Sequence, residues 1–258
     1  MNTSNTWITT HTECSNQDFN NAWRRTKKMI ERQILRVVYS PFKAFEDIVK
    51  NPVARGPLII LALGVITAAI MGYVSSSKVH IQLESELGPY VPLVTTDFFG
   101  GRMLSVVIDA ALRLSLTWFI YTGFMLLVIK MFGLSGGSWR VLFFVIGYTL
   151  MTTVVYTLIS ALLVSALPMV YLKYGVWNPT PEMEEAAYNE RLIAYGPWFS
   201  SPIYKFAYYL SFVVEGWTGA LAAIAIHALF GVTWRKAIAI SVIASVVTFL
   251  TRIVLLSL

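Results

Sequence analysis

Long apolar stretches alternate with short polar breaks along the chain from residue 57 onward. A helix of about 20 apolar residues spans the hydrocarbon core of a bilayer. Five stretches approach or exceed this length, with predicted bounds of 57–74, 105–132, 141–167, 204–230 and 237–256. We therefore predict an all-α membrane protein in which a five-span transmembrane helix bundle occupies residues 57–258.

Two of the predicted spans carry residues that favour contact with another helix. In the first span, Gly64, Ala68 and Gly72 recur at every fourth position, a spacing that lets a second backbone approach closely. The third span carries a stripe of hydroxyl side chains, formed by Thr149, Thr153, Tyr156, Thr157 and Ser160. Because a hydroxyl finds no water in lipid, it hydrogen-bonds across a helix interface. We therefore expect this stripe to face a neighbouring helix.

The first 56 residues are polar and basic, and they divide into two parts. Residues 1–18 are rich in Thr, Ser and Asn and lack periodicity, which predicts a mobile tail. Residues 19–56 form a predicted helical arm, in which apolar residues over 19–38 recur at helical spacing between cations. The cations expected to bind anionic headgroups at the membrane surface are Arg24, Arg25, Lys27, Lys28, Arg32 and Arg36. The alternative is that this helix packs against the protein itself.

The segment from Ser40 to Pro57 separates the arm from the first span. Ser40 followed by Pro41 is typical of a helix N-terminus, because serine caps free N–H groups and proline lacks one. The apolar face of this short helix is predicted to comprise Phe42, Phe45, Ile48 and Val49. Asn51-Pro52 should end the helix, and Gly56-Pro57 should turn the chain into the membrane.

Composition supports a membrane protein and excludes two kinds of site. Hydrophobic residues make up 56% of the chain and charged residues 13%, whereas a typical soluble domain carries about a quarter charged residues. The single cysteine, Cys14, excludes an internal disulfide and a metal site built from paired cysteines. The net charge of +6 arises mostly in the arm. We interpret this charge as an indication of how the protein is oriented in the membrane and of binding to anionic lipid rather than to nucleic acid.

The distribution of Lys and Arg predicts the orientation of the spans. Nine of these cations precede the first span, and the two short loops add Lys130, Arg140, Arg235 and Lys236. The two long loops, about 75–104 and 168–203, carry seven acids and fewer cations. Because cytoplasmic loops carry the excess of Lys and Arg, the N-terminus is predicted to be cytoplasmic. An odd number of spans then places the C-terminus outside.

Four ionisable residues fall within the predicted spans, where charges are costly and mark candidate sites. They are Asp109, Arg113, Glu215 and Arg252, which helix geometry places at similar depths in the outer half of the membrane. We predict that they form an intramembrane polar cluster, with Asp109 and Arg113 paired at i, i+4. The cluster is interpreted as structural ion pairing, as a polar pathway for an ion or solute, or as charges that reach the headgroups.

No enzyme motif has the partners that its chemistry requires. Ser135 lies in a G-x-S-G sequence, but it is predicted to sit in a short loop after an unbroken span, without the strand-to-helix elbow of a serine nucleophile. His227 is a lone histidine near the predicted inner surface, where we interpret it as a hydrogen-bonded packing residue. We therefore predict no catalytic residues, no metal site and no cofactor.

Three stretches resemble the Yip (Ypt-interacting protein) domain family over about residues 35–255. The stretches are Ser40–Pro57 with its S-P-x-x-x-F-x-x-I, N-P and G-P-L elements, Gly136–Leu150 with its glycine loop and G-Y segment, and Glu215–Ala237 with its W, H-x-L and K-A elements. The resemblance implies a cytoplasmic N-terminus, five spans and, for the eukaryotic members, trafficking roles with Rab-type small GTPases.

Three departures from the eukaryotic pattern argue against carrying the GTPase partner over to this chain. The arm is short, D-L-Y is missing before Gly56-Pro57, and the predicted outer loops are long. These departures favour a prokaryotic protein of the cell membrane over one of the ER or Golgi. We expect a membrane interaction or scaffold protein whose partners are anionic lipid and other membrane proteins or itself. The alternative is a transporter or channel component that uses the polar cluster.

Overall fold

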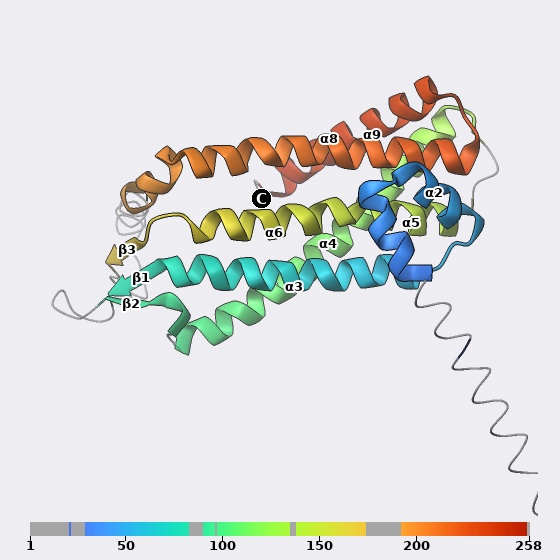
Figure 1. Cartoon of the computed structure of the whole chain (residues 1–258). Helices are drawn as coiled ribbons and strands as arrows, with labels where there is room; N and C mark the ends of the chain where they lie inside the picture. Colours follow the sequence, from blue (N-terminus) through green and yellow to red (C-terminus); the bar gives the residue numbers. More distant parts are fainter. Residues whose placement is uncertain are drawn as a thin grey trace, which may run out of the picture.

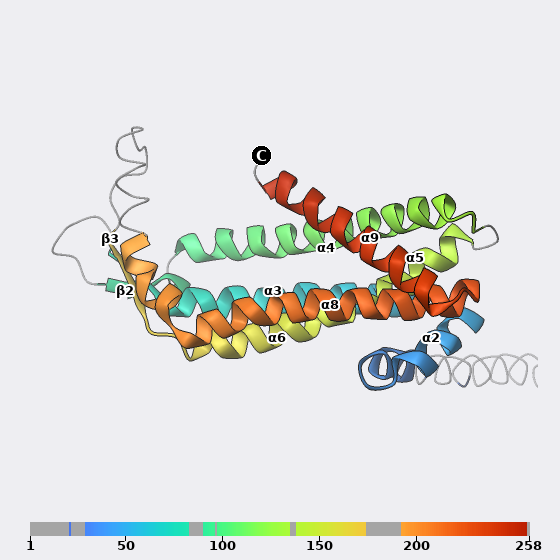
Figure 2. The same cartoon turned by 90° about the horizontal axis from the view of Figure 1, so that it is seen from above.

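The computed structural model is an elongated bundle of long helices with short helices at one end and a small sheet at the other (Figure 1). It describes residues 21, 29–82, 90–95, 97–134, 138–173 and 192–256. The long helices are α3 (Arg55–Lys78), α4 (Asp97–Met131), α6 (Met151–Ser165), α8 (Pro202–Phe230) and α9 (Trp234–Leu256). Seen from above, α3, α6 and α8 lie in one layer and α4 lies in a second layer (Figure 2). Helix α9 runs obliquely from the end of α8 across α4 (Figure 2).

Four helical segments among the described residues are long and apolar enough to cross a membrane. They are Arg55–Lys78, Met103–Met131, Trp139–Ser165 and Pro202–Phe230. These four candidate spans lie within a few residues of the first four predicted spans. Helix α9 lies where the fifth span was predicted, and its crossing of the membrane stays a prediction.

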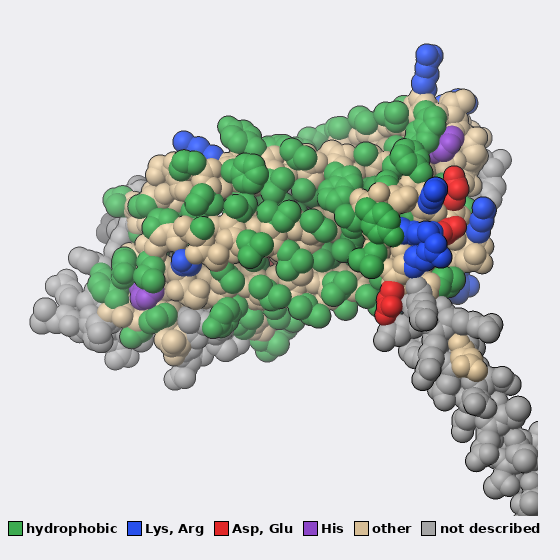
Figure 3. Space-filling view, viewed as in Figure 1, with side chains coloured by type: hydrophobic (Ala, Val, Ile, Leu, Met, Phe, Trp, Pro, Cys, Tyr) green, Lys and Arg blue, Asp and Glu red, His purple; other side chains and the backbone are tan. Residues whose placement is uncertain are grey.

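The surface of the bundle has the pattern expected of a protein in lipid. Apolar side chains cover the flank, while Lys, Arg, Asp and Glu side chains gather mainly at the end that holds α2 (Figure 3). Large side chains of the long helices, such as Leu112, Leu162 and Phe206, are more than half exposed. Water would oppose so much exposed apolar surface, but a hydrocarbon environment does not.

A three-stranded sheet joins the two long loops at the opposite end of the bundle. It is formed by β1 (Val79–Gln82), β2 (Tyr90–Pro92) and β3 (Val170–Lys173), in the order β2-β1-β3. Strand β1 pairs antiparallel with β2, with Ile81 opposite Val91, and parallel with β3, with Ile81 opposite Leu172. The all-α prediction is therefore wrong in this part of the chain, although both loops lie at one end as the predicted topology requires.

Part of the second long loop is helical. Helical structure spans 192–200 and continues through Gly196 and Pro197, a residue pair that usually ends a helix. Trp198 explains the continuation, because its side chain is buried and its Nε1 donates to the carbonyl of Pro168 at 2.7 Å. This tertiary contact outweighs the local preference of glycine and proline.

The arm folds back onto the end of the bundle opposite the sheet. Residues 29–39 are helical, and α2 (Pro41–Lys50) follows them, as predicted. Ser40 occupies the N-cap position, but its side chain makes no capping hydrogen bond. Instead, Arg36 forms an ion pair of 3.0 Å with Asp47 across the bend between the two helices.

The third span is not a continuous α-helix. Helix α5 (Trp139–Gly147) is followed by the 3₁₀ turn η2 (Tyr148–Leu150) and then by α6. Trp118 Nε1 donates to the carbonyl of Phe143 at 2.8 Å, and Thr149 Oγ1 donates to the carbonyl of Ile146 at 2.8 Å. These side chains hydrogen-bond to carbonyls close to the point where the regular backbone hydrogen bonds of the α-helix are interrupted. Within a membrane such carbonyls need a partner from the protein itself.

Candidate functional site

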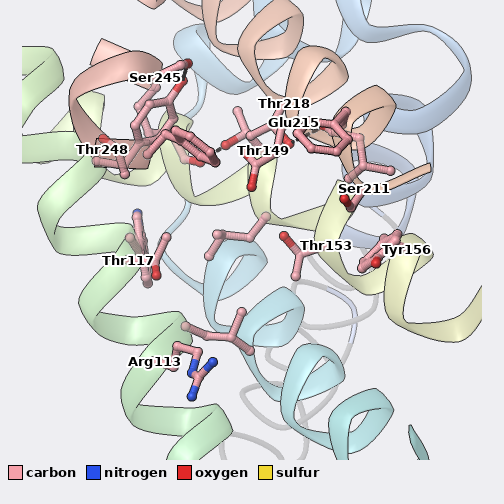
Figure 4. Close-up of a pocket in the computed structure, with 18 of the residues that line it drawn as sticks. Arg113, Thr117, Thr149, Thr153, Tyr156, Ser211, Glu215, Thr218, Ser245 and Thr248 are labelled. Carbon is pink, nitrogen blue, oxygen red and sulfur yellow. Dashed lines mark hydrogen bonds between the residues drawn. The ribbon is translucent and has the colours of Figure 1, made fainter. Parts of the chain in front are cut away.

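A cavity of about 480 Å³ lies between α4, the α5–α6 span, α8 and α9 (Figure 4). Its polar lining is drawn from all four: Arg113, Thr117, Tyr121, Thr149, Thr153, Tyr156, Tyr208, Ser211, Glu215, Thr218, Ser245 and Thr248. Its apolar lining consists of Leu114, Trp118, Ile146, Leu150, Phe212, Val214 and Phe249. The size is that of a small-molecule site, and the lining combines apolar and aromatic side chains with many polar groups.

The cavity lies near the middle of the bundle, because its lining residues lie near the middles of their helices. Glu215 is close to the centre of α8, Ser245 is close to the centre of α9, and Thr153 is close to the centre of Trp139–Ser165. Arg113 lies close to the centre of α4. A solute in this cavity would therefore sit near the midplane of the membrane.

Hydrogen bonds between helices hold the walls of the cavity together. The hydroxyls of Thr152 and Thr218 are 2.6 Å apart and join α6 to α8. Tyr121 Oη is 3.1 Å from Ser245 Oγ, which joins α4 to α9. Ser241, on the same helix as Ser245, donates to the carbonyl of Gly219 at 2.6 Å and joins α9 to α8. The predicted contact of the hydroxyl stripe with neighbouring helices is confirmed in part by the Tyr156 hydroxyl, which donates to the carbonyl of Ala207 on α8 at 3.5 Å.

Several hydroxyls of the lining donate their single proton to carbonyls of their own helices. The donors are Thr149 to Ile146 at 2.8 Å, Ser211 to Tyr208 at 2.6 Å, Thr218 to Val214 at 2.9 Å and Thr248 to Ala244 at 2.8 Å. A hydroxyl carries one donor and two lone pairs. These four oxygens therefore offer lone pairs rather than protons to anything in the cavity.

The structure places three of the four predicted intramembrane charges at or beside this cavity. Arg113 and Glu215 line it, and Asp109 pairs with Arg113 at 3.1 Å, one helical turn away. Both partners of that pair are 62% exposed, so the pair is solvated or lipid-facing rather than buried. Arg252 belongs to α9, but its side chain lies outside the described part of the structure. That Arg252 joins the other three residues in one cluster therefore stays a prediction.

Most of the cavity lining was not singled out in the sequence. The stripe on the third span contributed Thr149, Thr153 and Tyr156, but the facing residues of α8 and α9 were missed. The missed set on these helices is Tyr208, Ser211, Thr218, Ser245 and Thr248, whose spacings of three and seven place the residues of each helix on one face and form a usable signal.

The arm presents one face to the protein and another to its surroundings. Ile34, Val37 and Phe45 are buried in the main core together with residues of the third span. Leu35, Tyr39 and Phe42 are 59%, 70% and 55% exposed. The described part of the arm therefore packs against the protein itself, which was the alternative to binding lipid. It still carries an apolar outer surface.

The predicted membrane-surface cations are divided between described and undescribed segments. Arg32 is exposed, and Arg36 is partly buried in its ion pair with Asp47. Arg24, Arg25, Lys27 and Lys28 lie outside the described residues, as does the predicted tail 1–18. Binding of anionic lipid by this arm stays a prediction.

His227 is a packing residue in the structure, as predicted. Its Nδ1 is 2.6 Å from the carbonyl of Val232, and its ring stacks on Trp234 at 4.0 Å between centroids. The described part of the chain contains no group of three or more His, Cys, Asp or Glu residues that would hold a metal ion. Ser135 lies outside the described residues.

A family model described as the Yip1 domain matches residues 35–256. The match begins within the helical segment 29–39 and extends to the end of α9. No curated protein and no solved structure matches the chain.

Proposed function

Because the chain belongs to the Yip1 domain family of multi-pass membrane proteins, we propose that it is an integral membrane interaction and scaffold protein. Members of this family are generally non-enzymatic membrane trafficking proteins, which supports a role through contacts rather than through catalysis. The spans provide a rigid bundle, and the arm provides the surface that meets the membrane and its partners.

The observation that carries this proposal is the two-faced arm. Its inner face is fixed to the bundle by Val37 and Phe45, which are completely buried. Its outer side combines exposed Leu35, Tyr39 and Phe42 with exposed cations and exposed acids. A surface of apolar and charged side chains, held at the end of a membrane bundle, is suited to the headgroup region of a bilayer.

The proposed orientation is five spans with the N-terminus in the cytoplasm and the C-terminus outside. Support comes from Lys130, Arg140 and Arg235, which lie at the ends of their helices on the side of the bundle that also holds the arm. Cations concentrate on the cytoplasmic side of membrane proteins. We propose the cell membrane as the location, and other membrane proteins or further copies of this chain as partners.

Lipid dependence of thermal stability tests the proposed role of the arm. Purified, delipidated protein in detergent should be stabilised by phosphatidylglycerol and much less by phosphatidylcholine, since a lipid that binds only the folded state raises its stability. The double variant Arg32→Gln/Lys43→Gln removes two exposed cations of the arm and should lose most of the difference. Lys205→Gln, at the sheet end of α8, is the control and should keep it. Equal stabilisation by the two lipids, or an unaffected double variant, would contradict the proposal.

The cavity favours a second candidate function, that of a transporter or channel component. Sites near the midplane at an interface between helices are characteristic of transporters, and Glu215 is a membrane carboxylate at such a site. Glu215→Gln separates the two functions. If it abolishes a flux in proteoliposomes while folding is unchanged, the second function is favoured, and if only thermal stability changes, the scaffold is favoured.

A further inference from the structure

The geometry points to a binding site for a small organic cation, a protonated amine attached to an apolar group, in the cavity between α4, α6, α8 and α9. The proposal is independent of the scaffold function, because the arm lies at the end of the bundle and the cavity lies near its middle. Three properties of the lining support it: its hydrogen-bonding character, its aromatic residues and the distribution of its charges.

Four hydroxyls of the lining act as acceptors toward the cavity, while Arg113 supplies N–H donors at its far end. Thr149, Ser211, Thr218 and Thr248 have already donated their protons to backbone carbonyls, as described above. Glu215 adds a carboxylate, which in its ionised form only accepts. A ligand that satisfies such a lining must bring its own N–H or O–H groups, and an ammonium brings three of them.

Aromatic side chains line the same space, which is open on the side where Tyr208, Phe212 and Phe249 are 55%, 51% and 46% exposed. The lining contains Trp118, Tyr121, Tyr156, Tyr208, Phe212 and Phe249. The face of an aromatic ring attracts a cation, and the attraction strengthens when both are removed from water. The rings also accept an apolar substituent, so they favour an amine with a hydrocarbon or aryl group over an inorganic cation.

The two charged residues of the lining define the direction in which such a ligand binds. Glu215 lies beside Thr149 and Thr218, whereas Arg113 lies at the far end of the cavity from them (Figure 4). Asp109 offsets the charge of Arg113 through their ion pair. An ammonium is attracted to the Glu215 end, and the paired Arg113 offers it no attraction, so the apolar group points toward Arg113.

A neutral alcohol and a carboxylate of matched shape distinguish this ligand from others. Phenethylamine is protonated at neutral pH, phenethyl alcohol is its neutral counterpart, and 3-phenylpropionate is its anionic counterpart. Purified protein should show a rise in melting temperature with the amine, and quenching of tryptophan fluorescence through Trp118 should follow the same concentration dependence. The alcohol and the carboxylate should give neither signal.

Two variants test whether the cavity is the site of binding. Glu215→Gln should weaken binding of phenethylamine by about tenfold or more, the loss expected for one close charge interaction. Ser211→Phe keeps the carboxylate but fills the cavity, and it should abolish binding, so it decides the matter if Glu215→Gln does not fold. Glu46→Gln, on the exposed surface of α2, is the matched control and should bind as the parent protein does.

Three outcomes would overturn the inference. Equal responses to the amine and the alcohol would show that charge is not recognised, and preferential binding of the carboxylate would show that Arg113 dominates. Retention of amine binding in Ser211→Phe would show that the amine binds elsewhere on the protein or in the detergent. None of these results bears on the lipid dependence of the arm, which is measured separately.

Discussion

Tyr148 in the third span donates a hydrogen bond of 3.0 Å to Oε1 of Gln33 in the N-terminal arm. Both side chains are buried, with exposed fractions of 0% for Tyr148 and 4% for Gln33. A buried tyrosine hydroxyl requires a partner, and here the partner comes from a segment 115 positions earlier in the chain. The arm is therefore part of the folded bundle.

Two motifs that carry the family resemblance meet at this hydrogen bond. A Cβ atom added to Gly56 would collide with the hydroxyl oxygen of Tyr148. A Cβ added to Gly147 would lie 2.7 Å from Cβ of Pro57 and 2.6 Å from the ring of Trp118. Glycine at both positions thus allows the Gly56-Pro57 and Gly147-Tyr148 pairs to interlock, which explains physically why each motif has this form.

Replacing Tyr148 by Phe should destabilise the protein by about 1–3 kcal/mol, because the amide oxygen of Gln33 is left buried without a partner. The free energy of unfolding, measured by SDS titration in mixed micelles, reports the change. Tyr209→Phe is the control, since Tyr209 is 66% exposed and should have little effect. Adding Gln33→Leu to Tyr148→Phe should recover part of the loss. A fully stable Tyr148→Phe protein would contradict this role for the pair.

Gly56→Ala should cost about 1–3 kcal/mol, because the added methyl group forces α3 and the third span apart. Gly123→Ala on α4 is the matched control, since no atom lies within 4 Å of the added Cβ. That change should be neutral or stabilise the helix by up to about 1 kcal/mol. Thermal melting of both variants in the same detergent checks the difference, and similar melting temperatures would refute the close approach.

The pair of hydroxyls formed by Thr152 and Thr218 should stabilise the contact between α6 and α8 modestly. Hydrogen bonds between membrane helices contribute about 0.6 kcal/mol on average and at most about 1.7 kcal/mol. A double-mutant cycle with Thr152→Val and Thr218→Val should therefore give a coupling free energy in this range. A coupling of zero would show that the 2.6 Å contact adds nothing to packing.

The proposed orientation predicts which ends of the helices react with a reagent that cannot cross the membrane. In a Cys14→Ser background, Lys205→Cys should react with an impermeant maleimide added to intact cells. Lys50→Cys, at the end of α2, should react only after the membrane is permeabilised. Both side chains are exposed in the structure, so access to solvent on each side is the only variable. The opposite pattern would reverse the topology.

The helices were predictable from the sequence because each depends on local composition. The span Pro202–Phe230 shows this most clearly. The hydroxyl of Ser201 accepts from the N–H of Ile203 at 3.2 Å, and Gly231 ends the helix in the left-handed conformation with φ of 62°. Such caps and breaks depend on residues within a few positions of the helix ends that they determine.

The sheet and the cavity were not predictable in the same way, because both depend on residues that are distant in the sequence. Strand β1 has only four residues, and its parallel partner β3 lies about 90 positions later, so short-range periodicity contains little signal for the pairing. The hydroxyls of α8 and α9 form a cavity lining only because packing brings them together with Thr149 and Thr153. The 3₁₀ turn at Tyr148–Leu150 likewise follows directly after Gly147, against which Trp118 packs, and no local pattern encodes that contact.

The depth of the outer face of the arm tests the central claim most directly. Protein with Cys14→Ser and Tyr39→Cys is labelled with an environment-sensitive fluorophore and placed in phosphatidylglycerol nanodiscs that contain lipids with nitroxides near the headgroup. Glu46→Cys, on the exposed polar surface of α2, provides the reference position. The account predicts strong quenching at position 39 and weak quenching at position 46. Equal and weak quenching at both positions would show that the arm faces water, and it would contradict a membrane-contacting scaffold.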